Sequence, residues 1–133
     1  MLKNVKRLVT GAAVLATASA GLMIAPSVAQ AATYNGACGS GYSVISILPV
    51  TGGTVFLTYN GSTNCVVTVR NSSGSAVYMG AWIERSDGSG YQGDFGNYTT
   101  YAGPVYVYAP GSCIDWGGNI GGSYASQSNS HCG

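Results

Sequence analysis

The sequence has little charge and few of the side chains that enzymes use. Only nine of its 133 residues are charged, five basic and four acidic, and it has a single histidine. Disordered proteins are rich in charge and poor in aromatic residues, whereas this chain has ten tyrosines and is 46% hydrophobic. Its 21 glycines do not recur at every third position, which excludes a collagen-like repeat. The composition predicts one folded domain with few groups for catalysis.

The first 31 residues have the three-part layout of a secretory signal peptide. Three basic residues lie among the first seven, a weakly apolar run covers residues 8–25, and Ala-Gln-Ala at 29–31 precedes the expected cleavage site. The alternative is an uncleaved membrane anchor, because the apolar run approaches the length of a spanning helix. Since small and hydroxyl residues dilute that run, we expect cleavage, secretion and a mature domain of residues 32–133.

The expected mature domain contains no lysine. Two arginines against four carboxylates give it a formal net charge of −2. A basic patch is what holds the phosphates of nucleic acids or the headgroups of anionic lipids. We therefore expect no nucleic-acid partner and, once the signal peptide is removed, no membrane partner.

All four cysteines lie in the exported part, at Cys38, Cys65, Cys113 and Cys132. In an exported domain of this size an even number of cysteines predicts two disulfides, and four cysteines allow three pairings. We favour Cys38–Cys65 with Cys113–Cys132, because each bridge then closes a moderate loop within one half of the chain; each would stabilise the fold by about 3 kcal/mol. A zinc site is the weaker alternative, because the cysteines are widely spaced.

From residue 42 onward, short β-branched and aromatic runs alternate with turn residues, without the 3.6-residue apolar period of a helix. Seven strands are predicted, at residues 42–48, 54–59, 64–70, 76–85, 98–101, 104–109 and 112–116. This pattern predicts an all-β fold, an antiparallel β-sandwich or a small β-barrel stapled by disulfides. Residues 86–97 are expected to form a Gly- and Asp-rich loop, and residues 117–130 a Gly/Ser/Asn-rich C-terminal tail.

Two of the predicted strands, 76–85 and 104–109, separate aliphatic from aromatic side chains by simple alternation. The rings on the non-aliphatic side are those of Tyr78, Trp82, Tyr106 and Tyr108. If the aliphatic residues form the core, these rings form a flat aromatic face that can stack on a sugar ring or anchor a partner protein. The alternative is that the rings pack under a loop or form ordinary cross-strand pairs.

The motifs that resemble known functional signatures are weak. Leu-Pro-Val-Thr-Gly at 48–52 spells a sortase sorting signal, but it lies mid-chain and is expected to be a turn. No Gly-x-Ser-x-Gly elbow occurs, and the single imidazole, His131, adjoins Cys132. A nucleophilic hydrolase is therefore not predicted.

The acidic residues suggest two pairs that could act together. Glu84 and Asp115 would suffice for a glycosidase, and Asp87 and Asp94 could meet at a calcium ion. Nothing in the sequence brings either pair together, and two carboxylates are too few for a calcium site. We therefore predict no enzyme, no catalytic residue, no metal and no cofactor.

Five ordered blocks of the chain carry a family resemblance. They are residues 34–42, 53–60, 64–70, 101–108 and 113–118. Together they resemble the spore-associated protein A family of streptomycete-type actinobacteria. The resemblance implies a small secreted protein found with spores or aerial hyphae, and it carries over no catalytic residue. Residues 86–91 and the tail after residue 118 match least.

Two functions follow from these observations. The first is a secreted, non-enzymatic protein of the spore or cell surface, held there by a low-charge, tyrosine-rich exterior. The second is a secreted carbohydrate-binding module, or a small inhibitor of a secreted hydrolase, that uses the aromatic face. The expected partners are accordingly the spore or cell-envelope surface, a polysaccharide, or a secreted enzyme.

Overall fold

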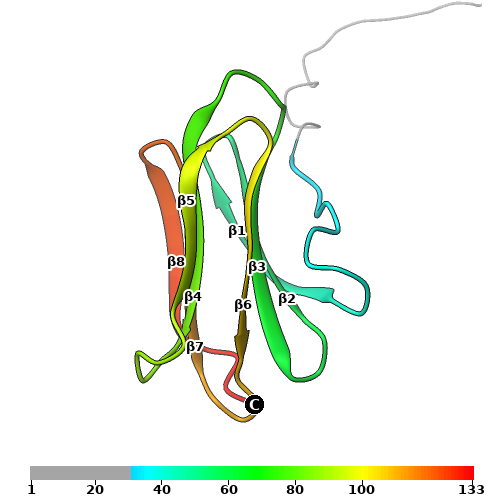
Figure 1. Ribbon diagram of the computed structural model, residues 1–133, viewed down its shortest axis with the longest axis vertical. Coiled ribbons are helices and arrows are strands. Elements are labelled where there is room, and N and C mark those ends of the chain that lie inside the picture. Colours follow the sequence, from blue (N-terminus) through cyan, green and yellow to red (C-terminus); the bar gives the residue numbers. More distant parts are fainter. Residues whose placement is uncertain (1–30) are drawn as a thin grey trace, which may run out of the picture. The chain divides into compact units, whose positions relative to one another are not determined.

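Eight strands form two four-stranded antiparallel sheets that pack against each other (Figure 1). The first sheet has the order β1-β2-β3-β6: β1 (Ser43–Val50), β2 (Gly53–Tyr59), β3 (Thr63–Arg70) and β6 (Tyr101–Tyr108). The second has the order β5-β4-β7-β8: β5 (Gln92–Tyr98), β4 (Val77–Arg85), β7 (Ile114–Ile120) and β8 (Ser123–Ser130). The all-β prediction is confirmed, and the fold is a sandwich rather than a closed barrel.

The computed structural model describes residues 31–133, and Ala32–Gly133 form one compact unit. The signal peptide predicted for residues 1–31 lies outside the described residues except for its last one. Within the described range, no helix is long and apolar enough to cross a membrane.

Three predictions about secondary structure were wrong. Residues 86–97 were expected to be a loop and residues 117–130 a tail, but they contain β5 and β8 and most of β7. Residues 98–101, expected to be one strand, instead span the end of β5 at Tyr98, a bend at Thr99 and Thr100, and the start of β6 at Tyr101. Glycine and serine lower local β-propensity, yet both missed strands pair with a neighbour along their length, so tertiary pairing overrides propensity.

The core lies between the two sheets. Its largest fully buried side chains are Trp116, Leu57, Met79, Ile83 and Ile114. The aliphatic residues that alternate along β4 and β6 point into this core, as predicted, while Tyr78 and Tyr108 on the opposite faces are exposed. The period of two in the sequence therefore assigned inward and outward positions correctly within each of these strands.

A glycine in the core allows the two sheets to make a buried hydrogen bond. Thr68 on β3 donates through its Oγ1 to the carbonyl oxygen of Gly80 on β4, at 2.8 Å. Gly118 on β7 lies beside this bond, and a Cβ atom there would lie 2.6 Å from the Gly80 oxygen and closer still to Thr68 Oγ1. The absence of a side chain at Gly118 thus leaves room for the bond.

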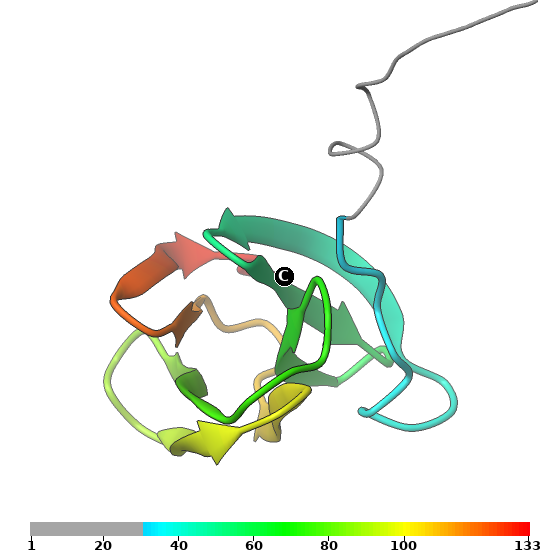
Figure 2. The same ribbon diagram turned by 90° about the horizontal axis from the view of Figure 1, so that it is seen from above.

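Both predicted disulfides are confirmed, Cys38–Cys65 and Cys113–Cys132. The first fastens the N-terminal segment, residues 32–42, to β3 on the outer side of the β1-β2-β3-β6 sheet (Figure 2). The second ties the end of the chain to the residue before β7.

The N-terminal segment covers a small apolar cluster on that outer face. The cluster consists of Phe56, Val67 and Val69, and Ala32, Tyr34 and Ala37 pack against it. The rings of Tyr34 and Phe56 lie 5.9 Å apart between centroids. The main-chain nitrogen of Ala32 also donates to Asn71 Oδ1 at 2.9 Å. One outer face of the sandwich is therefore covered by the chain itself.

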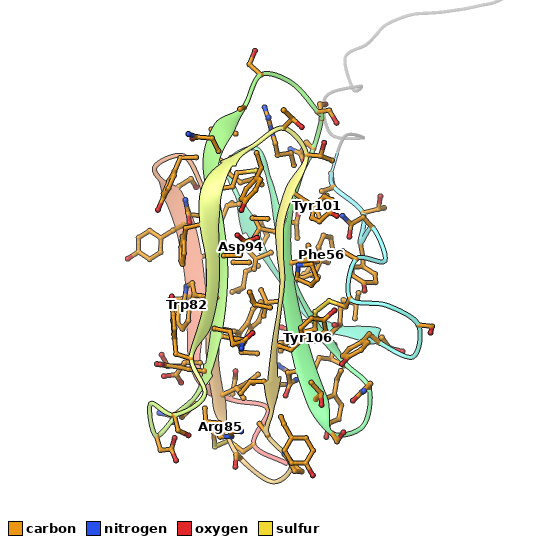
Figure 3. All side chains as sticks on the ribbon, viewed as in Figure 1. Phe56, Trp82, Arg85, Asp94, Tyr101 and Tyr106 are labelled. Atoms are coloured by element: carbon orange, nitrogen blue, oxygen red, sulfur yellow. A yellow bond between two sulfur atoms is a disulfide. The ribbon has the colours of Figure 1, made fainter. Side chains whose placement is uncertain are left out.

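Asp94 links the two sheets at the β5–β6 side of the sandwich (Figure 3). Its Oδ1 accepts a hydrogen bond from the Tyr98 hydroxyl, and its Oδ2 accepts one from the backbone nitrogen of Gly103 on β6 at 2.8 Å. Ionised Tyr98 could not donate this bond and would face the Asp94 carboxylate. The hydrogen bond to Asp94, with burial and charge repulsion adding to it, therefore raises the pKa of Tyr98 above 10.0.

We expect Tyr98→Phe to lower stability near neutral pH but not in strong alkali. A tyrosine whose pKa is raised by folding stabilises the fold below the unfolded pKa, and this contribution is lost as pH rises through the folded pKa. The stability difference between wild type and Tyr98→Phe should thus be present at about pH 8 and disappear well above pH ~10. Urea denaturation at both pH values measures it, with Tyr108→Phe as the exposed control. An equal difference at both pH values would contradict the prediction.

Candidate functional site

The four rings predicted to share a face lie on two different sheets. Tyr78 and Trp82 belong to β4, whereas Tyr106 and Tyr108 belong to β6. The outward faces of the two sheets of a sandwich point in opposite directions. Figure 3 shows Trp82 and Tyr106 on opposite sides of the molecule. The prediction of a single face was wrong, because alternation within a strand does not reveal which sheet the strand joins.

Tyr106 has a structural role under the N-terminal segment. Its hydroxyl donates to the backbone oxygen of Cys38 at 3.1 Å, and its ring packs edge-on against Tyr42 with centroids 5.8 Å apart. Burial, together with the neighbouring Tyr42 and Tyr34, raises the pKa of Tyr106. The alternative interpretation, a ring packed under a loop, is therefore correct for Tyr106. Tyr108 is exposed at the end of β6.

Three further rings, which were not predicted from the sequence, lie on the same side of the sheet as Tyr78 and Trp82: those of Phe95, Tyr124 and Tyr91. Gly80 on β4 pairs with Phe95 on β5 on one side and with Asn119 on β7 on the other. Asn119 in turn pairs with Tyr124 on β8. Tyr91 precedes β5 and stacks on Trp82. From here on, the name aromatic face is used for the five rings on the outer side of the β5-β4-β7-β8 sheet, and it no longer includes Tyr106 and Tyr108. Its rings are those of Tyr78, Trp82, Tyr91, Phe95 and Tyr124.

Four of the five rings of the aromatic face form two near-parallel pairs, and all five rings have surface that is open to solvent. Tyr78 and Phe95 have centroids 6.5 Å apart and planes inclined by 23°. Trp82 and Tyr91 have centroids 6.4 Å apart and planes inclined by 24°. Trp82 is half-buried, and the other four side chains are between 43% and 75% exposed. Each pair thus presents aromatic surface outside the core.

Glycines on three adjacent strands lie beneath or beside these rings. A Cβ atom on Gly80 would collide with the ring of Phe95, and one on Gly93 would lie 2.8 Å from Phe95 Cε1. On Gly117 it would lie 2.5 Å from the backbone oxygen of Ala125. Rings that cover glycines in neighbouring strands compensate for the packing that those glycines lack. The sequence signal for the aromatic face is therefore this pairing of glycine with a ring on the adjacent strand, which becomes visible only when the register is known.

One carboxylate pair that the sequence could not bring together does meet on this sheet. Glu84 on β4 and Asp115 on β7 are direct cross-strand partners. Asp115 Oδ1 accepts hydrogen bonds from Ser86 Oγ at 2.6 Å and from the backbone nitrogen of Asn129 at 2.9 Å. Asp115 thereby connects the β4–β5 loop to the end of β8, and these hydrogen bonds give it a structural role.

The carboxylates of the other suggested pair, Asp87 and Asp94, bind different residues and share no hydrogen-bond partner. Asp87 Oδ1 accepts hydrogen bonds from the side chain and the backbone nitrogen of Ser89, which together with Arg85 lower the pKa of Asp87. Asp94 is engaged with Tyr98 and Gly103. Across residues 31–133, no group of three His, Cys, Asp or Glu side chains is placed to hold a metal ion.

Comparison with known proteins decides the family. Spore-associated protein A of Streptomyces coelicolor (strain ATCC BAA-471 / A3(2) / M145) is 47% identical to this chain over 123 residues, covering 86% of this chain and 80% of the relative. The chain belongs to the spore-associated protein A family. The resemblance seen in the sequence blocks is thus confirmed. No family model and no solved structure matches the chain.

Proposed function

We propose that this member of the spore-associated protein A family is a secreted, non-enzymatic protein that is retained on the surface of the spore or hypha. The observation that carries the proposal is the 47% identity to a relative named for its association with spores. The two disulfides support an extracellular location, because such bridges persist in oxidising compartments.

The surroundings of the single histidine support a non-enzymatic role. His131 lines a small hollow together with Ile45, Tyr59, Asn64 and Ala109. Neither these residues nor Gly133, which also lines the hollow, has a serine, threonine or cysteine side chain for the imidazole to activate, or a side-chain carboxylate to orient it. Glu84 and Asp115 are cross-strand partners on β4 and β7, and Asp115 already accepts hydrogen bonds from Ser86 in the β4–β5 loop and from Asn129 on β8.

The distribution of charge supports retention on a surface. In the expected mature chain no charged residue occurs before Arg70, and the six charged residues from there on are two arginines and four acids. A surface with so little charge produces weak long-range repulsion from another surface. Short-range contacts through aromatic and hydroxyl groups then decide whether the protein stays attached.

Cell fractionation tests the proposal. An antibody against the protein is used on washed spores, vegetative mycelium and culture medium of the producing organism, with a soluble secreted enzyme as the control for trapped medium. We expect the protein, but not the control, to remain with the washed spores or aerial hyphae. Its presence in the medium alone would contradict the proposal.

A further inference from the structure

The aromatic face offers two ring pairs along one direction of the sheet. Tyr78 and Trp82 are four residues apart on the same side of β4, which places them about 13 Å apart along the strand. Each stacks on a ring from the β5 side, Phe95 and Tyr91 respectively. A ligand that runs along β4 and β5 would therefore meet aromatic surface twice.

The surface around the two ring pairs is flat, because neighbouring groups cover the glycines of this sheet. The rings of Phe95 and Tyr91 cover Gly80 and Gly93, and Ala125 and Ser126 lie against Gly117, so neighbouring groups fill the space that these glycines leave open. Flat, extended surfaces suit extended ligands, whereas small molecules bind in concave pockets that enclose them. The geometry therefore favours a long, straight chain lying across the sheet.

The polar groups around the rings are uncharged over most of the face. Asn97 is the cross-strand partner of Tyr78, Asn119 that of Gly80, and Ser126 that of Gly117. The charged pair on this side, Glu84 and Asp115, is negative and lies at one end. An anionic polymer would be repelled there, and a neutral polymer rich in hydroxyl groups matches the amide, hydroxyl and phenol groups.

We propose that the aromatic face binds an extended, neutral, β-linked polysaccharide, with sugar rings stacked on the Tyr78–Phe95 and Trp82–Tyr91 pairs. A β-linked pyranose with equatorial hydroxyls presents C–H groups on its flat side and hydroxyls at its edge. The flat side packs on an aromatic ring by dispersion and its weakly positive hydrogens face the negative π surface. The edge hydroxyls reach Asn97, Asn119 and Ser126. This inference rests on the proposed surface association and identifies the contact that produces it.

A pull-down on insoluble polysaccharides tests the binding. The probes are cellulose and chitin powders, which are extended and β-linked, and insoluble starch, which is α-linked and curved. The protein is collected as secreted by a host that expresses the full chain. We expect retention on cellulose or chitin and little on starch. Trp82→Ala should weaken retention by about tenfold or more, because it removes one of the two stacking surfaces.

The matched control is Tyr108→Ala, which removes an exposed ring from the other sheet and should leave retention unchanged. Folding of Trp82→Ala is checked by the fluorescence of Trp116, which is then the only tryptophan and is fully buried. Failure of the wild-type protein to bind cellulose and chitin would overturn the proposal. So would equal retention of folded Trp82→Ala, or equal retention of the wild type on starch.

The two proposals fail in different ways. If the protein remains on washed spores but binds neither cellulose nor chitin, the aromatic face is not a polysaccharide site and the surface association stands. If it binds these polysaccharides through Trp82 but is absent from spores and hyphae, the site stands and the proposed surface association is overturned.

Discussion

Replacing Gly118 with alanine is expected to destabilise the protein by about 3–5 kcal/mol. The added Cβ would lie 2.6 Å from the backbone oxygen of Gly80 and still closer to Thr68 Oγ1. These two atoms form the buried hydrogen bond between the sheets. Relief of the clash must therefore either move the β4 backbone or break that bond, which would leave a donor and an acceptor without partners in the core.

Urea denaturation measures the Gly118→Ala effect, and the midpoint should fall without a change in slope. Gly122→Ala is the matched control, because Gly122 lies in the β7–β8 turn, where an added Cβ would have no atom within 4 Å. Its stability should stay within about 0.5 kcal/mol of wild type. Comparable losses in the two variants would show that the inter-sheet contact is not what the alanine disturbs.

Removing the Cys38–Cys65 bridge in Cys38→Ala/Cys65→Ala is expected to cost about 3–4 kcal/mol. The bridge closes a loop with a sequence separation of 27, and loss of such a constraint increases the entropy of the unfolded chain. Cys65 is fully buried and Cys38 nearly so, which adds small cavities to the cost. For a domain of about 100 residues the melting temperature should fall by roughly 15–25 °C.

The same variant should also release the N-terminal segment from its sheet. Limited proteolysis followed by mass spectrometry is expected to detect cleavage within residues 32–42, since the bridge holds them over Phe56, Val67 and Val69. The double variant of Cys113 and Cys132 is the control. It breaks a loop with a separation of 19 and costs about 3 kcal/mol, but it should leave the N-terminal segment protected. Early cleavage of that segment in both variants would contradict this role.

Properties that depend on neighbours in the chain were predictable from the sequence. The period of two along β4 and β6 identified Met79, Ala81 and Val105 as core residues. The even number of cysteines predicted two disulfides, and the moderate length of the loops that they would close favoured the pairing that the structure contains. Both arguments use only the local chain or the lengths of the loops that would be closed.

Properties that depend on strand pairing were not predictable. Gln92–Tyr98 contains two glycines and an aspartate, and only its partners β4 and β6 explain why it is a strand: Phe95 covers Gly80, and Asp94 binds the backbone of Gly103. Propensity scales treat each residue alone and miss such compensation. For the same reason, Tyr78 and Tyr106 were grouped together although their strands belong to opposite sheets.

The two broad sides of the sandwich are unlike each other, because the N-terminal segment covers one and leaves the other bare (Figure 1). If the aromatic face binds a flat polymer as proposed, the molecule lies on that polymer in one orientation. With the aromatic face against the polymer, residues 32–42 and the Cys38–Cys65 bridge point outward to the medium. Antibodies raised against that segment should label intact, coated spores, whereas antibodies against Trp82 and its neighbours should reach their epitope only after the protein is detached.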